Sequence, residues 1–322
     1  MKRFFVAIAC LALASPAWAE KPRRVPIQRP ASPLAPVTAT IAGSPLTIVV
    51  GDDTSTQVYN SNVPGTGQFY PPDCAAGETA DNGIFVGNGG IVYGPDFDNH
   101  PCGSASNTYN PWVPVSFSGV TGTGTLADPF QVVIVVAAGA TGLVMTETLT
   151  YVNGSSRSNI SLAFSQAPPP SGPAGALTFT VLQAADLYLA DNDSGFGLLQ
   201  GGSVGGRAED GNCAPLAYTI LITGDTPPTT WSATGYGTIW DEVSADSLPN
   251  NVDSTICEDN GAALLWANQV VPVTIETGVS FAGSAVPLGA TVPALSPKAL
   301  ASLVLLLAAV GYVLARKSSL GA

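Results

Sequence analysis

The segment LVMTETLTYVNGSSRSNISLAF, residues 143–164, decides the fold class, because apolar and polar residues alternate on both sides of one turn. Asn153-Gly154 is the strongest short turn signal, since a type I′ turn needs positive φ at both central residues. With these two residues as the loop, Leu143 faces Phe164 and the apolar side chains of both strands share one face. A one-residue slip would destroy that agreement, so we predict an antiparallel hairpin in this register. The opposite face then carries Val144, Thr146, Thr148 and Thr150.

More strands are expected along the rest of the chain. The 35 glycines and 27 prolines favour short strands joined by tight turns, and no segment outside the termini shows a sustained helical period. Roughly 250 residues of strands are too many for one immunoglobulin-like unit of about 100 residues. We therefore predict an all-β fold, a large antiparallel β-sandwich over residues 46–290. The expected strands are Leu46–Val50, Ile84–Val86, Val113–Val120, Phe130–Ala137, Leu143–Val152, Ser158–Phe164, Ala176–Gln183, Ala217–Thr223 and Val270–Phe281.

The charge balance excludes one class of partner. The chain has 11 basic and 23 acidic residues, a net charge of −12. From residue 31 to 297, 22 acidic residues stand against Arg157 and Arg207 alone, a net charge of −20. Nothing in this composition supplies a basic surface for phosphates, so nucleic-acid binding is not expected. An acidic, soluble outer surface is the simplest interpretation.

The N-terminus has the three parts of a secretory signal peptide. Lys2-Arg3 precedes a short apolar run, and Ala17-Trp18-Ala19 forms a small-residue cleavage site. We predict a signal peptide at residues 1–19, handled by the Sec translocon and signal peptidase. Residues 20–45 are rich in proline and basic residues and are expected to form an extended linker.

The C-terminus indicates a membrane anchor. Residues 299–315 form an uncharged run rich in Leu, Ala and Val, followed by Arg316-Lys317. About 17 residues is the short limit for a transmembrane helix, and the basic pair predicts a cytoplasmic C-terminus. A buried core helix is the alternative. If residues 299–315 span the membrane, the precursor is anchored in the inner membrane and its β-sandwich, residues 46–290, is exported and faces the periplasm.

Residues 291–322 resemble the IPTL-CTERM sorting signal of Gram-negative bacteria. A short motif, Val292-Pro293-Ala294-Leu295-Ser296, precedes the apolar helix and the basic tail. Pro293, Leu295 and Ser296 match that family, whereas Ala294 replaces Thr and Lys298 stands where a Trp is usual. The resemblance implies recognition by an exosortase-type transpeptidase and delivery to the cell envelope or surface.

The body resembles uncharacterised secreted bacterial proteins with a large β-supersandwich. The similar segments are 128–132, 142–143, 146–152, 194–197 and 259–266. Some cysteine and aromatic positions of that family are replaced here. This resemblance implies one continuous supersandwich-like domain and no particular activity.

Four cysteines remain after removal of the signal peptide. An even number in an exported chain favours two disulfides over zinc ligation, since no Cys-x-x-Cys spacing occurs and His100 is the sole histidine. Of the three possible connectivities we favour Cys74–Cys102 and Cys213–Cys257. Each would stabilise the fold by roughly 3–4 kcal/mol if unstrained.

Two groups of residues in the body are candidates for catalysis or ligand binding. His100 lies in a turn-rich loop without a Gly-x-Ser-x-Gly elbow, so a surface histidine is favoured over a catalytic base. Asp241 and Glu242 form a candidate carboxylate pair for glycoside chemistry. Because aromatic rings stack on sugars, Trp231, Tyr236 and Trp240 complete a speculative ligand site with this pair.

Residues 191–195 suggest a cation site. Asp191, Asn192 and Asp193 offer oxygen ligands before a turn-forming Gly, a pattern suited to Ca²⁺. The EF-hand pattern is incomplete, and an ordinary Asx-turn explains the residues about as well.

These features together favour a non-enzymatic β-sandwich protein sorted to the envelope or surface, a structural module or one that binds a glycan or another surface partner. The alternative is a secreted carbohydrate-active enzyme that uses paired carboxylates. An aromatic-lined cleft with two facing carboxylates would favour the enzyme, and a shallow surface would favour the binding module.

Overall fold

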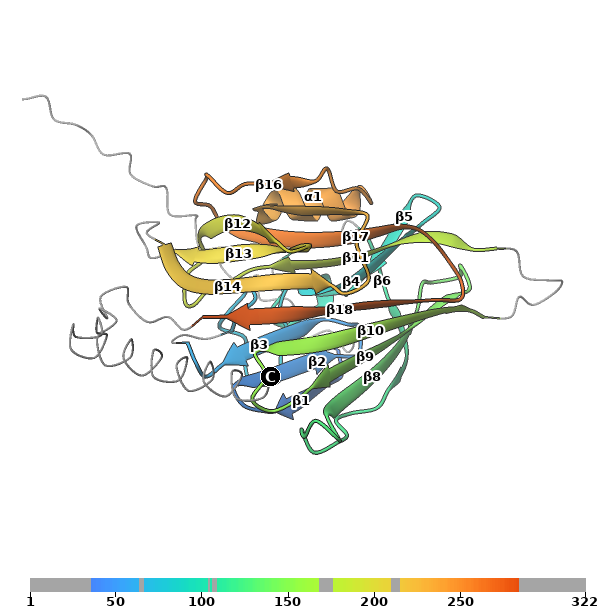
Figure 1. Cartoon of the computed structure of the whole chain (residues 1–322). Helices are drawn as coiled ribbons and strands as arrows, with labels where there is room; N and C mark the ends of the chain where they lie inside the picture. Colours follow the sequence, from blue (N-terminus) through green and yellow to red (C-terminus); the bar gives the residue numbers. More distant parts are fainter. Residues whose placement is uncertain are drawn as a thin grey trace, which may run out of the picture. The chain divides into compact units, whose positions relative to one another are not determined.

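The computed structural model describes residues 36–63, 67–103, 105, 109–167, 176–209 and 215–283. Within these ranges the chain is an all-β sandwich, as predicted, with two large sheets and one small sheet (Figure 1). The predicted signal peptide at 1–19, most of the linker, the sorting motif Val292–Ser296 and the apolar run at 299–315 lie outside the described residues. Among the described residues, no helix is both long and apolar enough to span a membrane.

The first large sheet has eight antiparallel strands. Its order is β12 (Gly195–Gln200), β13 (Ser203–Glu209), β14 (Pro215–Gly224), β18 (Val273–Ala282), β10 (Arg157–Gln166), β9 (Leu143–Tyr151), β8 (Phe130–Ala137) and β7 (Val113–Phe117). The decisive hairpin, β9–β10, therefore lies inside the sheet rather than at an edge. In β9, burial alternates strictly with residue number, as the sequence pattern predicts.

The second large sheet has seven strands and is mostly antiparallel. Its order is β16 (Asn251–Val252), β15 (Thr230–Gly235), β17 (Asn260–Val270), β11 (Thr178–Asp186), β4 (Asn82–Asn88), β5 (Ile91–Gly94) and β6 (Asn110–Pro111). Two short pairings, β15–β16 and β5–β6, are parallel. Strand β17 ends before Pro272, which cannot donate to a ladder, so the strand expected at Val270–Phe281 begins at Val273 instead.

The small sheet consists of β1 (Thr38–Ala42), β2 (Leu46–Gly51) and β3 (Thr56–Asn60). Strand β1 falls inside the range predicted as linker, and its Ile41 is fully buried opposite Ile48. The main hydrophobic core includes residues of this sheet together with the facing sides of both large sheets. The small sheet therefore takes part in the core of the sandwich.

The hairpin register differs from the prediction by two residues. Leu143 pairs with Gln166, and Phe164 pairs with Met145. The turn is not type I′, because Gly154 has φ 86° whereas Asn153 does not have positive φ. Asn153 instead accepts a hydrogen bond from the Ser44 backbone N–H, which fixes the loop to the β1–β2 turn. A shift of two residues leaves every side chain on its predicted face.

One helix was not expected. Helix α1 (Tyr236–Ser244) covers the outer side of the seven-stranded sheet and buries Ile239 and Val243 (Figure 1). Two apolar residues four positions apart are too few to show a sustained helical period. Together with the 3₁₀ turn η1 (Phe97–Asn99), the helix helps enclose a second core on this side of the sheet.

Candidate functional site

The predicted aromatic and carboxylate site is divided by the seven-stranded sheet. Trp231 packs against the core between the large sheets, whereas Trp240 packs on the opposite side against Phe85 and Phe97. Asp241 is exposed on α1, and Glu242 is half-buried beneath it. Burial raises the pKa of Glu242, with an opposing effect from the Ser232 hydroxyl. Tyr236 is the first residue of the helix. Because Trp231 and Trp240 lie on opposite sides of the sheet, these five residues do not form one aromatic-lined cleft with facing carboxylates.

The predicted calcium loop forms hydrogen bonds of its own. The Asn192 side-chain oxygen accepts from the Ser194 backbone N–H, as in an Asx-turn, and Tyr188 donates to Asp191. Asp193 stands between Asn192 and Ser194 in this turn. In the part of the chain that the structure describes, no group of three or more acidic, histidine or cysteine side chains is arranged to hold a metal ion.

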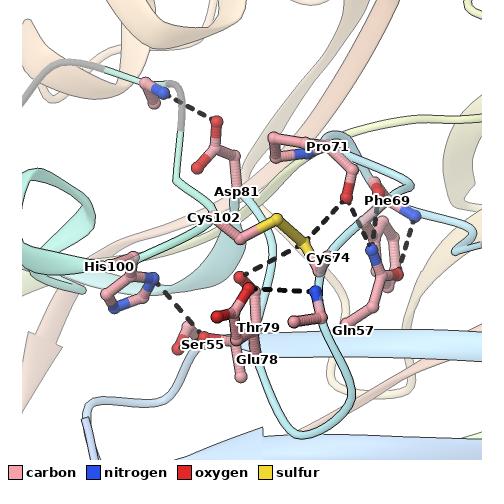
Figure 2. Close-up of a disulfide and its surroundings, with 12 residues drawn as sticks. Ser55, Gln57, Phe69, Pro71, Cys74, Glu78, Thr79, Asp81, His100 and Cys102 are labelled. Atoms are coloured by element: carbon pink, nitrogen blue, oxygen red, sulfur yellow. Dashed lines mark hydrogen bonds between the residues drawn. A yellow bond between two sulfur atoms is a disulfide. The ribbon is translucent and has the colours of Figure 1, made fainter. Parts of the chain in front are cut away.

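One predicted disulfide is confirmed directly. Cys74 and Cys102 are joined, with Cα atoms 5.4 Å apart, and tie the segment after β3 to the loop after η1 (Figure 2). Cys257 is also disulfide-bonded, and its expected partner Cys213 lies outside the described residues. Buried Gln57 holds the first segment in place, because its side-chain nitrogen donates to the carbonyls of Phe69 and Pro71.

His100 is buried, contrary to the expectation of a surface histidine. Its Nε2 lies 2.6 Å from Asp53 Oδ2, and Asp53 is itself buried. On the other side of the ring, Nδ1 lies 3.4 Å from the Thr79 hydroxyl. Ser55 completes the group, with its hydroxyl 2.6 Å from Asp53 Oδ1 and 2.8 Å from Thr79 (Figure 2 shows His100, Thr79 and Ser55). The carboxylate–imidazole–hydroxyl order resembles a proton relay, but these four side chains are closed off from solvent.

The number of protons that Ser55, Thr79 and His100 can donate bears on the charge of the His100 ring. An ionised Asp53 can only accept, so Ser55 donates to it, and the Ser55 oxygen must then accept from Thr79. The Thr79 oxygen is left to accept from His100 Nδ1, while Nε2 donates to Asp53. All four groups have a hydrogen-bond partner when both ring nitrogens carry protons, and the raised pKa of His100 favours the same imidazolium form.

The directions in which the pKa values of Asp53 and His100 are shifted agree with a buried ion pair. Burial alone would raise the pKa of Asp53, but His100, Ser55 and the Asp96 backbone N–H together lower it below its ordinary value. Burial would lower the pKa of His100, but the carboxylates of Asp53, Asp81 and Asp96 raise it. Asp81 is held by its own hydrogen bond from the Ala105 backbone N–H (Figure 2).

Glu147 is the second buried ionisable group, and its environment is different. It lies in the middle of β9 on the face that packs between the sheets, and it is 1% exposed. Neither carboxylate oxygen has a hydrogen-bond partner among the residues that the structure describes. Burial, with a smaller effect from Asp53, raises the pKa of Glu147 to about 8. Asn82, Gln183 and other residues of both sheets and the small sheet line a cavity beside it.

Where β8, β9 and β10 meet, the outward side of the eight-stranded sheet has one charged residue, Arg157 at the start of β10, which is paired with Asp225. Thr148 lies between Val133 and Ser161, and the same pattern of small and hydroxyl-bearing residues continues along the three strands. We call this surface the outer hydroxyl face. It is formed by Gln131, Val133, Val135, Thr146, Thr148, Thr150, Asn159, Ser161, Ala163 and Ser165. Glu276 of β18 lies beside it and accepts a hydrogen bond from Ser161.

No family model matches the chain, and no curated protein matches it. Among solved structures, a bacterial glucoamylase complexed with acarbose has a TM-score of 0.48 and 11% identity, covering 80% of this chain but 33% of that one. A proposed aldose 1-epimerase from Escherichia coli K12 has a TM-score of 0.40 and 10% identity, covering 76% and 98%. A mutant heparan sulfate lyase, HepC, from Pedobacter heparinus has a TM-score of 0.37 and 9% identity, covering 77% and 37%.

Proposed function

We propose that the chain is an exported β-sandwich protein that binds a neutral glycan through the outer hydroxyl face and does not catalyse a reaction. The observation that carries this proposal is the contrast in charge: residues 31–297 have a net charge of −20, whereas none of the ten residues of the outer hydroxyl face is charged. Hydroxyl and amide groups on this face can exchange hydrogen bonds with sugar hydroxyls. The surrounding carboxylates would repel a polyanion, so a neutral polymer is the partner that fits.

The location of the ionisable groups argues against the carbohydrate-active enzyme. A general acid or base must come within hydrogen-bond reach of the substrate. The His100–Asp53 pair and Glu147 are enclosed, and Asp241 is exposed whereas Glu242 is half-buried. The carboxylate pair expected from the sequence therefore does not supply two equally accessible groups for the enzyme hypothesis.

Export and sorting belong to the same proposal. The three-part N-terminus, the motif at 292–296 and the apolar run with its basic end support passage through the Sec translocon and cleavage by an exosortase-type transpeptidase. Mass spectrometry of the mature protein from its native host tests this step. We expect a product that lacks residues 299–322, and an intact tail would contradict the sorting proposal.

Binding can be tested by placing a charge in the middle of the outer hydroxyl face. Thr148→Glu should abolish retention of the purified chain on an array of neutral glycans, because the new carboxylate would be desolvated on contact. Thr238→Glu is the matched control, since Thr238 is exposed on α1, on the other sheet. Equal retention of both variants, or no retention of the wild type, would contradict the proposal.

The same preparations distinguish the alternatives. Release of new reducing ends from a polysaccharide by the wild type, lost in Asp241→Asn or Glu242→Gln, would establish the enzyme instead. A dimer in sedimentation that Thr148→Glu converts to monomer would assign the face to a second copy of the chain and overturn glycan binding.

A further inference from the structure

Glu147 is an ionisable group whose burial needs an explanation. It projects from β9 into the space between the two large sheets, and neither of its carboxylate oxygens has a hydrogen-bond partner among the described residues. A buried carboxylate without a compensating partner is among the most costly groups in a protein interior. Protonation of the carboxylate, or an enclosed water molecule, would lower that cost.

The adjoining cavity limits what can be enclosed beside Glu147. The space open to the centre of a water molecule is about 10 Å³, close to the minimum that one water needs. The walls include the apolar side chains of Ile48, Leu149 and Ile160, which cannot solvate an ion. Polar groups are present as well, from Thr54, Thr56, Asn82, Ser158 and Gln183, and a single water with two to four polar partners fits such a lining.

We propose that Glu147 is a proton-binding site inside the sandwich, occupied by a neutral carboxylic acid and one enclosed water molecule at neutral pH. The acid O–H donates to the water, and the water donates to the polar side chains that line the cavity. This site is separate from the outer hydroxyl face, which lies on the opposite side of the same sheet, and it is independent of any glycan.

The charged surroundings of the site are consistent with a neutral acid. Besides Glu147, the residues that line the cavity, from β2, β3, β4, β9, β10, β11, β18 and the adjoining loops, include no ionisable side chain. Asp53 is the charged group that acts on Glu147, and its negative charge opposes ionisation. His100 contacts Asp53 rather than Glu147, so among the described residues that line the cavity no cation is present to balance an ionised Glu147.

The consequence is uptake of a proton on folding. The carboxyl of the unfolded chain ionises near its ordinary pKa of 4.5, whereas the folded chain keeps the proton up to about 8. Between these values the folded state binds one more proton than the unfolded state, so rising pH favours unfolding. One proton changes the equilibrium constant of unfolding by about tenfold per pH unit.

Denaturant unfolding of the full chain from pH 5 to pH 8 tests this. Glu147→Gln, a neutral side chain of the same shape, should remove about tenfold per pH unit from the pH dependence of the wild-type unfolding constant. Glu276→Gln is the matched control, because it is the same substitution on the exposed side of the same sheet, and it should leave the dependence unchanged. Equal pH dependence in the wild type and Glu147→Gln would overturn the proposal.

A second measurement needs no variant. The infrared spectrum of the wild type at pH 7 should contain the C=O stretch of a protonated carboxylic acid, which disappears when the chain unfolds. Absence of that band would overturn the proposal even if Glu147→Gln fails to fold. Stability should also be equal in sodium and potassium salts at one ionic strength, and a difference that Glu147→Gln abolishes would assign the cavity to a cation instead of a proton and water.

Discussion

The His100–Asp53 pair and Glu147 are both buried, yet the chain treats their charges in opposite ways. His100 and Asp53 neutralise each other at 2.6 Å, and Ser55 and Thr79 occupy their remaining hydrogen-bonding positions. Glu147 has no such neighbours in the part of the chain that the structure describes, and its pKa is raised instead. A buried charge persists where a partner and hydrogen bonds compensate for lost hydration, and where they are missing the group becomes neutral. Four experiments would break or sharpen this contrast, from the largest expected effect to the smallest.

Removing one member of the pair should have the largest effect. Asp53→Asn keeps the shape of the side chain but removes the carboxylate that contacts His100, and we expect a loss of about 3–5 kcal/mol in the free energy of unfolding. Denaturant unfolding at pH 6 measures it. Asp241→Asn removes an exposed carboxylate of the same kind and should change stability by about 0.5 kcal/mol or less. Similar losses in both variants would show that the pair has no special role.

The two sites together predict the pH of maximum stability. The pKa of Asp53 is lowered, so its contribution is present above the ordinary pKa of 3.8 and is lost as the pH falls through its folded value. The pKa values of His100 and Glu147 are raised, so their contributions are complete below 6.5 and 4.5 and are lost as the pH rises. We expect a maximum at mildly acidic pH and a loss of about 3–4 kcal/mol between pH 5 and pH 8 from Glu147 alone. A maximum above pH 7 in denaturant unfolding would contradict these directions.

The Cys74–Cys102 disulfide holds the two segments that carry Thr79 and His100. Its residues are 28 positions apart, and the chain-entropy relation gives about 3–4 kcal/mol for a loop of this length. Replacing both cysteines with serine should lower the free energy of unfolding by that amount and also speed hydrogen exchange at Ala105, whose N–H is bonded to Asp81. Unchanged exchange at Ala105 would mean that the bond stabilises the fold without holding this network.

The smallest of these effects comes from one hydroxyl. Thr79→Val removes the group between Ser55 and His100 while keeping its volume, and we expect a loss of about 1 kcal/mol. Because His100 Nδ1 then has no acceptor, the pKa of His100 should fall in an NMR titration. Thr238→Val, on exposed α1, is the control. A rise in that pKa would contradict the donor assignment for the ring.

The fold class followed from local patterns, and its details required long-range contacts. The alternation around Glu147 gave the correct face for every residue of β9, but the register depended on a bond from Ser44, more than 100 positions away in the chain. Several strands were not predicted, among them β3, β15 and the central strand β17. For β12 and β13 the reason is that their glycines are unfavourable in strands by propensity alone. Gly205 is nevertheless required in β13, because a Cβ there would overlap the backbone of Ile220 on the neighbouring strand.

In the candidate sites, too, some features were predictable from the local sequence and others depended on contacts between distant residues. The Cys74–Cys102 pairing was predictable, since an even number of cysteines and moderate spacing favour it. The partnership of His100 with Asp53 was not, because the two residues are 47 positions apart and no local motif joins them. A signal for Glu147 was present, since the hairpin pattern places a charged residue on an apolar face, but a single sequence does not indicate whether such a residue is paired.

The most direct test is a side-chain NMR titration of the wild-type chain, which observes the glutamate carboxyl carbons and the ring nitrogens of His100 in one sample. At neutral pH we expect a protonated Glu147 together with a His100 ring that carries protons on both nitrogens. An ionised Glu147, or a singly protonated ring, in the folded protein would show that the two sites do not hold opposite charge states.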